Sequence, residues 1–369
     1  MKRNRLLPLV IWLLLGLLIA GLSGWHPTHA TSPDSAHYLR MASDWRTYDG
    51  TFPPGYSGLI WLVSTLTNLP GLWASKLVNW LVLGHFGWAW TNRIGAKRAV
   101  WLLGIWLLPG NLRVATYTWS ETVFIVLLLE AVWRLYRLQV QVEQSRKNAL
   151  WVAGVLVALF WVRYVGLFLY IGAAFRTVIL RRAVKPIGLW HRSLTPLYIL
   201  GIAPLLLLNL FLTDYLFGGP RLLPTETWPE LLRMMGVAVL NEVLLYDYQA
   251  NTNLSLFIPA LLVQLLGVVI AVWWLRHKGG WQRVSFAQNP LVRCLFSVGL
   301  TYFLTLFILR TISPFDPLTE RLMTPGSICW LVALVMSVQS QHSIINKSPE
   351  RAETFTNPSS AASLLLPER

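Results

Sequence analysis

The sequence predicts an all-α, polytopic membrane protein: a transmembrane helical bundle of about ten spans, each near the bilayer thickness, with a helical first outer loop. Three observations predict this class. Of the 369 residues, 55% are hydrophobic and 13% are charged, with a mean hydropathy of +0.51, whereas soluble domains carry about 25% charged residues. Apolar runs close to 20 residues recur along the chain. The 20 Trp and 12 Tyr are typical of the aromatic belts at membrane interfaces.

The distribution of charge indicates the orientation. The net charge is +15, and the basic residues cluster between apolar runs, as the positive-inside rule predicts for cytoplasmic loops. This pattern argues against nucleic acid as a partner. We therefore expect a multi-pass integral membrane protein, in the plasma (inner) membrane if the source is bacterial.

The first apolar run, residues 6–23, follows a basic N-terminus. A cleavable signal peptide is an alternative, with a cleavage site near residue 30. However, the run exceeds the usual 7–15 residues of a signal-peptide core, which favours an uncleaved first span.

The second apolar run, residues 56–69, is too short to cross comfortably and ends at a Pro-Gly pair. If it crossed fully, Arg93 and Lys97 would lie outside, against the positive-inside rule. We therefore expect an interfacial or re-entrant helix here.

One transmembrane domain, residues 1–340, accommodates all the predicted spans. They cover residues 6–23, 72–92, 99–111, 120–138, 149–162, 164–180, 195–213, 254–275, 294–310 and 322–339. The larger outer loops are 24–53 and 214–253. The tail, 341–369, is polar and is expected to be a disordered cytoplasmic segment. Cys294 and Cys329 lie in apolar segments and are expected to pack as small hydrophobic residues.

Asp34 is the most informative outer-loop acid, because it follows Pro33 just beyond the first span. Two interpretations remain open on residue type alone. Asp is a favoured helix N-cap. A carboxylate at the membrane surface could equally act as a general base toward an acceptor hydroxyl.

Three cations lie near the outer ends of predicted spans: Lys76, Arg163 and Arg321. Each could extend its charge to the interface while its stem stays in the apolar region. Arginine also binds phosphate well through its planar set of donors, and charges within membrane segments are candidates for functional sites.

Two acids belong to the fourth predicted span. Glu121 opens it after Ser120, where an acid favours the positive helix end. Glu130 lies in its middle and is expected to be buried, and either protonated or paired.

Six short motifs, in this order, resemble those of the GT-C glycosyltransferases, and in particular the family 39-like relatives of protein O-mannosyltransferases and aminoarabinose transferases. The motifs are Asp34-Ser35-Ala36-His37-Tyr38, Pro53-Pro54-Gly55-Tyr56, Lys76-Leu77-Val78-Asn79, Ser120-Glu121-Thr122-Val123-Phe124, Arg163-Tyr164-Val165-Gly166-Leu167-Phe168 and Glu320-Arg321-Leu322-Met323-Thr324-Pro325. The resemblance covers about residues 6–338.

The resemblance implies a glycosyltransferase that moves a hexosyl or pentosyl unit from a polyprenyl-phosphate donor to an acceptor, with inversion, on the non-cytoplasmic face. Asp34 would be the catalytic base. The substrate-binding residues would be Tyr38, Tyr56, Lys76, Glu121, Arg163, Tyr164 and Arg321. No metal-ligand set and no cofactor are assigned. A divalent cation bridging a carboxylate and the donor phosphate stays an open alternative.

Two other classes of function remain. One is a transporter or flippase for lipid-linked sugars, although the chain has no convincing paired repeat of the kind that transporters show. The other is a non-catalytic membrane assembly subunit. The sequence has no Walker, GxSxG, HExxH or CxxC motif, so it gives no sign of ATP hydrolysis, serine hydrolysis or zinc proteolysis.

Overall fold

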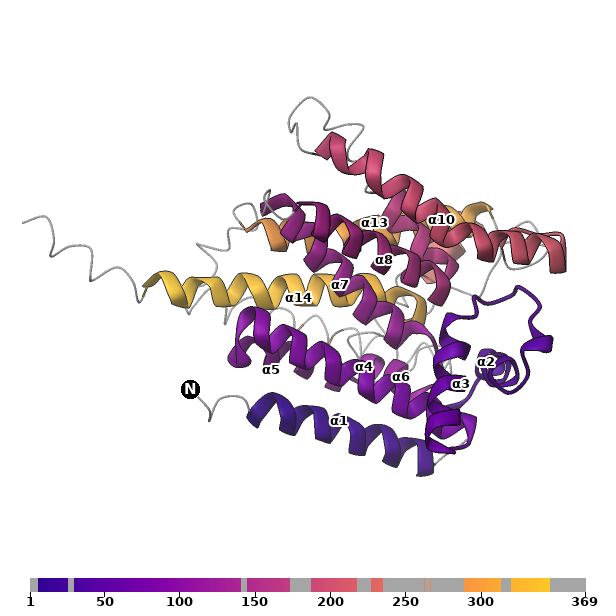
Figure 1. Cartoon of the computed structure of the whole chain (residues 1–369). Helices are drawn as coiled ribbons and strands as arrows, with labels where there is room; N and C mark the ends of the chain where they lie inside the picture. The colour runs from indigo at the N-terminus through magenta and orange to yellow at the C-terminus, as the bar shows by residue number, and fades with distance from the viewer. Residues whose placement is uncertain are drawn as a thin grey trace, which may run out of the picture.

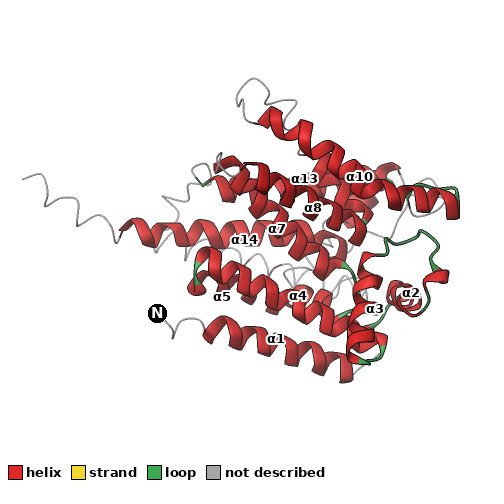
Figure 2. Ribbon diagram, in the orientation of Figure 1, coloured by secondary structure: helices red, strands yellow, loops and turns green. Residues whose placement is uncertain are grey.

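The structure is a computed structural model, and its described part is helical throughout, without strands (Figure 2). The described residues are 6–25, 30–140, 145–172, 187–217, 227–234, 262, 266, 289–312 and 320–345. The predicted span 254–275 apart from residues 262 and 266, most of the 214–253 loop, and residues 346–369 of the predicted tail lie outside them.

The long helices pack side by side, and two of the short helices, α2 and α3, lie together at one end of the bundle (Figure 1). The long helices are α1 (Leu6–Trp25), α4 (Gly71–Ile94), α7 (Glu121–Val140), α8 (Ser145–Val162), α10 (Ile187–Thr213), α13 (Pro290–Ile312) and α14 (Glu320–Ile345). The short elements are α2 (Pro33–Ser43), η3 (Trp45–Thr47), α3 (Gly55–Thr67), α5 (Ala96–Gly104), η4 (Ile105–Leu107), α6 (Pro109–Thr116) and η6 (Tyr164–Gly166).

Helix α7 is central, because it packs against α4, α8, α13 and α14. Its apolar side chains are buried on several faces, including Phe124, Leu128 and Val132. Charged residues occur at its first turn and in its second half. A helix of this kind can hold charges toward both ends of the bundle, up to about 24 Å apart at 1.5 Å per residue.

Helices α1 and α4 are locked by two tryptophans. The rings of Trp12 and Trp80 stack with centroids 4.3 Å apart. Each indole N–H donates to the backbone carbonyl of the other tryptophan, at 2.9 and 3.0 Å. Glycine makes this approach possible, since a Cβ on Gly16 would lie 2.4 Å from Trp80 and one on Gly84 would lie 2.7 Å from Trp12. The first span is therefore an integral part of the bundle.

Large apolar side chains cover the outside of several long helices. Leu17, Leu200 and Phe211 are 72%, 69% and 86% exposed. Exposed apolar surface on this scale marks contact with another phase or partner, and lipid is the expected one for helices of this length.

Three described helices are long and apolar enough to cross a membrane: Leu6–Gly24, Thr195–Thr213 and Pro290–Thr311. A bent pair, Ala96–Leu107 and Pro109–Thr116, would make a fourth if it forms one broken span. The coarse prediction of a helical membrane bundle holds, while the number of about ten spans stays a prediction.

Two predicted spans differ from the observed helices. The predicted span 99–111 is interrupted, because the chain turns by 78° between η4 and α6. Leu108 is extended and precedes Pro109, as expected of a residue before proline. Helix α10 begins at Ile187, earlier than predicted, and continues through Pro196 and Pro204.

Helix α3 is 13 residues long, about 20 Å, and so is shorter than a bilayer core of about 30 Å. It packs against α2 and α4. Tyr56 and Ile60 are buried on one face, while Leu66 is 74% exposed on another. Asn68 ends the helix in a left-handed conformation with φ 55°. The helix therefore lies at the end of the bundle with α2.

Gly55 lets the start of α3 lie directly on the end of α8. A Cβ at this position would lie 2.5 Å from the carbonyl oxygen of Trp161, a backbone atom that cannot rotate away. We expect Gly55→Ala to lower the free energy of unfolding by about 1–3 kcal/mol, as overpacking does. Thermal unfolding of the detergent-solubilised chain measures this.

Gly154→Ala is the matched control, because nothing lies within 4 Å of a Cβ built on Gly154. Alanine favours a helix over glycine by up to about 1 kcal/mol, so this variant should be as stable as the wild type or more so. Equal stability of the two alanine variants would contradict the close contact at Gly55.

Candidate functional site

Helix α2 begins with a reciprocal cap, and Asp34 is not the capping residue. Ser32 is the N-cap: its hydroxyl accepts from the Ser35 amide at 3.3 Å, and the Ser35 hydroxyl accepts from the Ser32 amide at 3.0 Å. Pro33 fills the first helical position, where its missing N–H costs nothing. The interpretation of Asp34 as N-cap is therefore wrong, and its carboxylate is available for another partner.

That partner is Arg321, which forms an ion pair with Asp34 and another with Glu121. Arg163 also pairs with Glu121. We call Asp34, Glu121, Arg163 and Arg321 the charge cluster. Its members come from α2, the start of α7, the residue before η6, and the start of α14. The cluster thus joins four elements that are distant in sequence.

The cluster is balanced in charge and largely withdrawn from water. The Glu121 side chain is fully buried, and those of Arg321, Arg163 and Asp34 are 11%, 15% and 17% exposed. Buried charges require partners of opposite sign, since an unpaired ion in a low-dielectric site is very costly. Two carboxylates and two guanidinium groups meet this requirement.

The Glu121 carboxylate uses its two oxygens unequally. Oε1 accepts from both arginines, whereas Oε2 has no hydrogen-bond partner among the described residues. A buried acceptor without a donor is uncommon. The cluster therefore retains hydrogen-bonding capacity toward a donor group.

Aromatic residues enclose the cluster. The guanidinium of Arg321 lies 4.5 Å from the centre of the Trp119 ring, a favourable cation–π arrangement. The Trp119 indole N–H donates to the Ser32 hydroxyl at 2.7 Å. The Trp119 side chain therefore connects Arg321 to the cap of α2.

The tyrosines named from the sequence, Tyr38 and Tyr56, are buried beside the cluster. The Tyr38 hydroxyl lies 2.9 Å from the Ser120 hydroxyl, and its ring meets that of Tyr56 edge-on at 5.2 Å. Burial raises the pKa of the Tyr38 phenol well above its usual range, although Arg163 acts in the opposite direction. Tyr38 therefore stays protonated and is unsuited to act as a base.

Lys76 is buried rather than extended toward the interface, since only 4% of it is exposed. Its ammonium donates to the carbonyl of Ala30 at 3.1 Å and to the hydroxyl of Thr118 at 2.9 Å. Asn79, one turn later, donates to the carbonyls of Ala115 and Tyr117 at 2.9 and 3.1 Å. These two residues of α4 hold the chain just before Glu121.

Tyr164 fixes the loop between η3 and α3. Its hydroxyl donates to the carbonyl of Gly50 at 2.8 Å and accepts from the Asn209 amide at 2.8 Å. Tyr48 donates to the side-chain oxygen of the same asparagine. Asn209 is completely buried in α10. It was not singled out from the sequence, although a polar residue inside an apolar span is a usable signal.

Glu130 has the partners that the sequence could not identify. It pairs with Arg93 and with Arg134, the latter at 2.7 Å. This pairing lies nine residues along α7 from Glu121, nearer the other end of the bundle. Glu130 therefore does not belong to the charge cluster.

The described residues contain no group of three His, Cys, Asp or Glu side chains placed to hold a metal ion. The carboxylates of the cluster, Asp34 and Glu121, are both occupied by arginines. Because both carboxylates are already paired with arginine, this donor set does not fit a resident divalent cation.

We expect Glu121→Gln to destabilise the protein by about 3 kcal/mol, because removal of one member of a buried ionic group leaves the opposite charges uncompensated. Thermal unfolding in detergent measures this. Glu230→Gln is the control, since Glu230 is exposed and its bonds to Thr227 can be made by an amide oxygen. Equal unfolding temperatures for the two variants would contradict a structural role of the cluster.

Comparison with known proteins agrees with the architecture. No protein-family model and no curated protein sequence matches the chain. One solved structure that matches is ArnT from Cupriavidus metallidurans in the apo state, with a TM-score of 0.56 and 15% sequence identity. The match covers 91% of this chain and 61% of ArnT, so the chain spans less than two thirds of that protein's length. ArnT is an aminoarabinose transferase of the GT-C family, and the chain described above shares the fold of ArnT, with three described helices that are long and apolar enough to cross a membrane.

Proposed function

We propose that the chain is a membrane glycosyltransferase that moves a sugar from a polyprenyl-phosphate donor to an acceptor. Transfer takes place on the non-cytoplasmic face, with inversion, and Asp34 is the base. The observation that carries the proposal is the charge cluster, which places a partly exposed carboxylate beside two arginines in a fold similar to that of ArnT.

Exposure distinguishes the two carboxylates. Glu121 is fully buried and is held by both arginines, whereas Asp34 is 17% exposed and pairs with Arg321. An acceptor hydroxyl must come within hydrogen-bond reach of its base. Asp34 meets this condition better. Glu121 fits a positioning role, in which it fixes Arg163 and Arg321.

The arginines suit the donor phosphate. A guanidinium has five N–H donors, so an arginine that bonds a carboxylate can also bond a phosphate oxygen. As the bond between the anomeric carbon and the phosphate oxygen breaks, negative charge on the leaving phosphate increases. Arg163 and Arg321 would stabilise that charge. The leaving group is already a phosphate, so no strong general acid is needed.

The proton balance is simple. The acceptor hydroxyl attacks the anomeric carbon from the face opposite the phosphate, which inverts the configuration. Asp34 takes the hydroxyl proton as the new glycosidic bond forms, and the lipid phosphate leaves with the bonding electron pair. Protonated Asp34 later returns the proton to solvent.

The proposed orientation of the chain in the membrane follows from the charges at the C-terminal ends of α4 and α7, which lie at the opposite end of the bundle from the charge cluster. Basic residues gather at the C-terminal ends of both helices, Arg93 in α4 and Arg134 and Arg137 in α7, and Lys97 follows α4 at the start of α5. The positive-inside rule assigns such an end to the cytoplasm. The charge cluster, at the start of α7, then faces the other side.

Two cysteine variants test this orientation. Ser43 and Lys97 are both exposed, one in α2 and the other in α5, and the native Cys294 and Cys329 are buried. We expect an impermeant maleimide to label Ser43→Cys in intact cells, and Lys97→Cys only after the membrane is permeabilised. The reverse pattern would place the cluster in the cytoplasm.

We expect Asp34→Asn to lower the rate of sugar transfer by about 10²-fold or more, in line with the contribution of a general base. The amide keeps the size of the side chain and removes the proton acceptor. The assay follows transfer from a radiolabelled polyprenyl-phosphate sugar in membranes that contain the native acceptor.

Asp214→Asn is the matched control. Asp214 is another outer-loop acid, exposed and with φ 59°, a left-handed conformation that asparagine also adopts readily. It should transfer at the wild-type rate. Near-normal transfer by a folded Asp34→Asn protein would move the base to another outer acid. Absence of transfer by the wild type in the complete assay, with transport of the lipid-linked sugar instead, would favour a transporter.

A further inference from the structure

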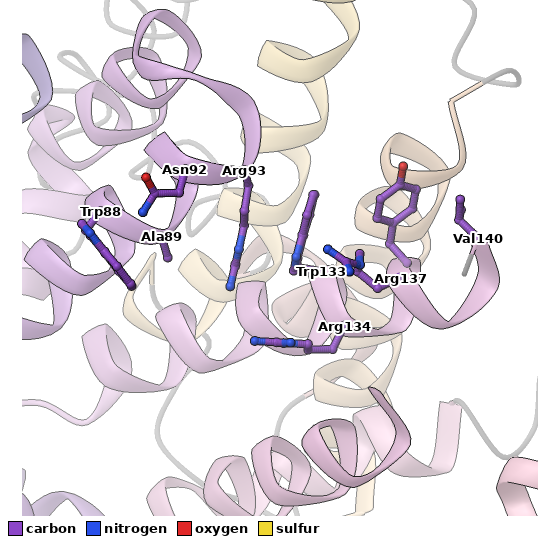
Figure 3. A pocket seen from close by; sticks show the side chains of 9 residues that line it. Trp88, Ala89, Asn92, Arg93, Trp133, Arg134, Arg137 and Val140 are labelled. Atoms are coloured by element: carbon purple, nitrogen blue, oxygen red, sulfur yellow. The ribbon is translucent and has the colours of Figure 1, made fainter. Parts of the chain in front are cut away.

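A second charged feature lies at the opposite end of the bundle from the charge cluster. A pocket with a volume of about 520 Å³ is lined by the last turns of α4 and α7 (Figure 3). Among the described residues that line it, three are arginines, Arg93, Arg134 and Arg137, and none is acidic. The proposed transfer reaction uses none of them.

These arginines are crowded. Arg134 and Arg137 both lie close enough to Arg93 to repel its charge. Glu130, just outside the lining, pairs with Arg93 and Arg134. One carboxylate therefore opposes three guanidinium groups, and the described part of this region carries an excess of positive charge that an anion would offset.

Hydrogen-bond donors are also left over. Nη1 of Arg93 and Nε of Arg137 are buried and have no hydrogen-bond partner among the described residues. Buried donors are nearly always satisfied in native proteins. Arg93 and Arg137 both line the pocket, so an anion bound there, such as a phosphate diester, would lie beside both guanidinium groups and offset their charge.

The aromatic residues suggest where this anion is attached. Trp133 stands between Arg93 and Arg137 in Figure 3, and its ring centre is 5.2 Å from the Arg93 guanidinium. Trp88, at the edge of the pocket, is 67% exposed. Exposed tryptophans at helix ends sit at the level of lipid headgroups. The pocket volume also falls in the range of small-molecule sites, larger than inorganic phosphate requires.

We propose that this pocket binds the headgroup of an anionic phospholipid in the cytoplasmic leaflet. The arginines bond the phosphate, and Trp88 packs against the glycerol and the upper part of the acyl chains. Basic pockets between transmembrane helices on the cytoplasmic side bind such headgroups in other proteins. Bound lipid would screen the repulsion among the arginines and so stabilise the packing of α4 against α7.

The test uses the full chain in neutral detergent and soluble dioctanoyl phosphatidylglycerol as the probe, with the unfolding temperature as readout. We expect this lipid to raise the unfolding temperature in a saturable manner, since a ligand stabilises the state that it binds. Dioctanoyl phosphatidylcholine and inorganic phosphate at the same concentrations should not. An equal rise with inorganic phosphate would show a site for free anions and overturn the lipid assignment.

Two single-residue variants test whether the lipid binds in this pocket. Arg137→Gln should weaken the apparent affinity about fivefold, the usual contribution of one basic residue near an anionic lipid. Lys97→Gln, an exposed basic residue at the same end that does not line the pocket, should bind as the wild type does. Equal loss in both variants, or loss in neither, would overturn the proposal.

Trp88→Ala is the second variant, in case Arg137→Gln does not fold. Because its side chain is largely exposed, its removal should leave the bundle intact and weaken phosphatidylglycerol binding through lost contact with the lipid. Wild-type affinity in Trp88→Ala would contradict the predicted position of the headgroup.

Discussion

The ionic contacts of Arg321 are the constraint on which the end of the bundle that carries the charge cluster depends. One guanidinium at the start of α14 pairs with the buried Glu121 of α7 and the partly exposed Asp34 of α2. It also lies over Trp119. Because Glu121 is completely buried, this region can be stable only while the arginines stay in place. The same geometry holds the candidate base at a fixed distance from the candidate phosphate ligands.

The same need to pair a buried acid with arginine recurs further along helix α7. Glu121 pairs with cations at one end, and Glu130 pairs with Arg93 and Arg134 toward the other. Between them the helix is packed with apolar side chains. Both acids therefore anchor arginines from other elements, Glu121 those of α14 and the residue before η6 and Glu130 that of α4, which explains why a central helix of the bundle retains charges.

Much of the fold could be predicted from the sequence, because long apolar runs and the charge asymmetry report directly on membrane helices. The break at Leu108 was missed even though Pro109 was visible, since the apolar run continues across it. The positions of Asp34, Glu121, Arg163 and Arg321 at span ends made them candidates. Their pairing could not be predicted, because Glu121 and Arg321 are 200 positions apart and no local pattern encodes such a contact.

Contacts with neighbouring groups explain the remaining differences between the sequence-based interpretations and the structure. Asp34 looked like a cap because it follows proline, yet Ser32 and Ser35 cap each other more completely. Lys76 looked like a residue that reaches the interface, yet backbone carbonyl and hydroxyl acceptors lay within its reach inside the protein. Asn209 was hidden in a long apolar run, and its importance lies in the loop that it holds, which only the tertiary structure reveals.

The tryptophan lock between α1 and α4 has a consequence for depth in the bilayer. Each indole bonds a carbonyl on the other helix at one height only, so α1 cannot slide along α4 without losing both bonds and moving each indole away from the glycine that makes room for it. The chain leaves α1 only a few residues before Ser32. In a bilayer, the register of these two hydrophobic helices would help to set the height of the Asp34 carboxylate relative to the hydrocarbon boundary. A lipid-linked substrate of the proposed kind, whose phosphate is confined to that boundary, would then meet the carboxylate at a height to which the two tryptophans contribute.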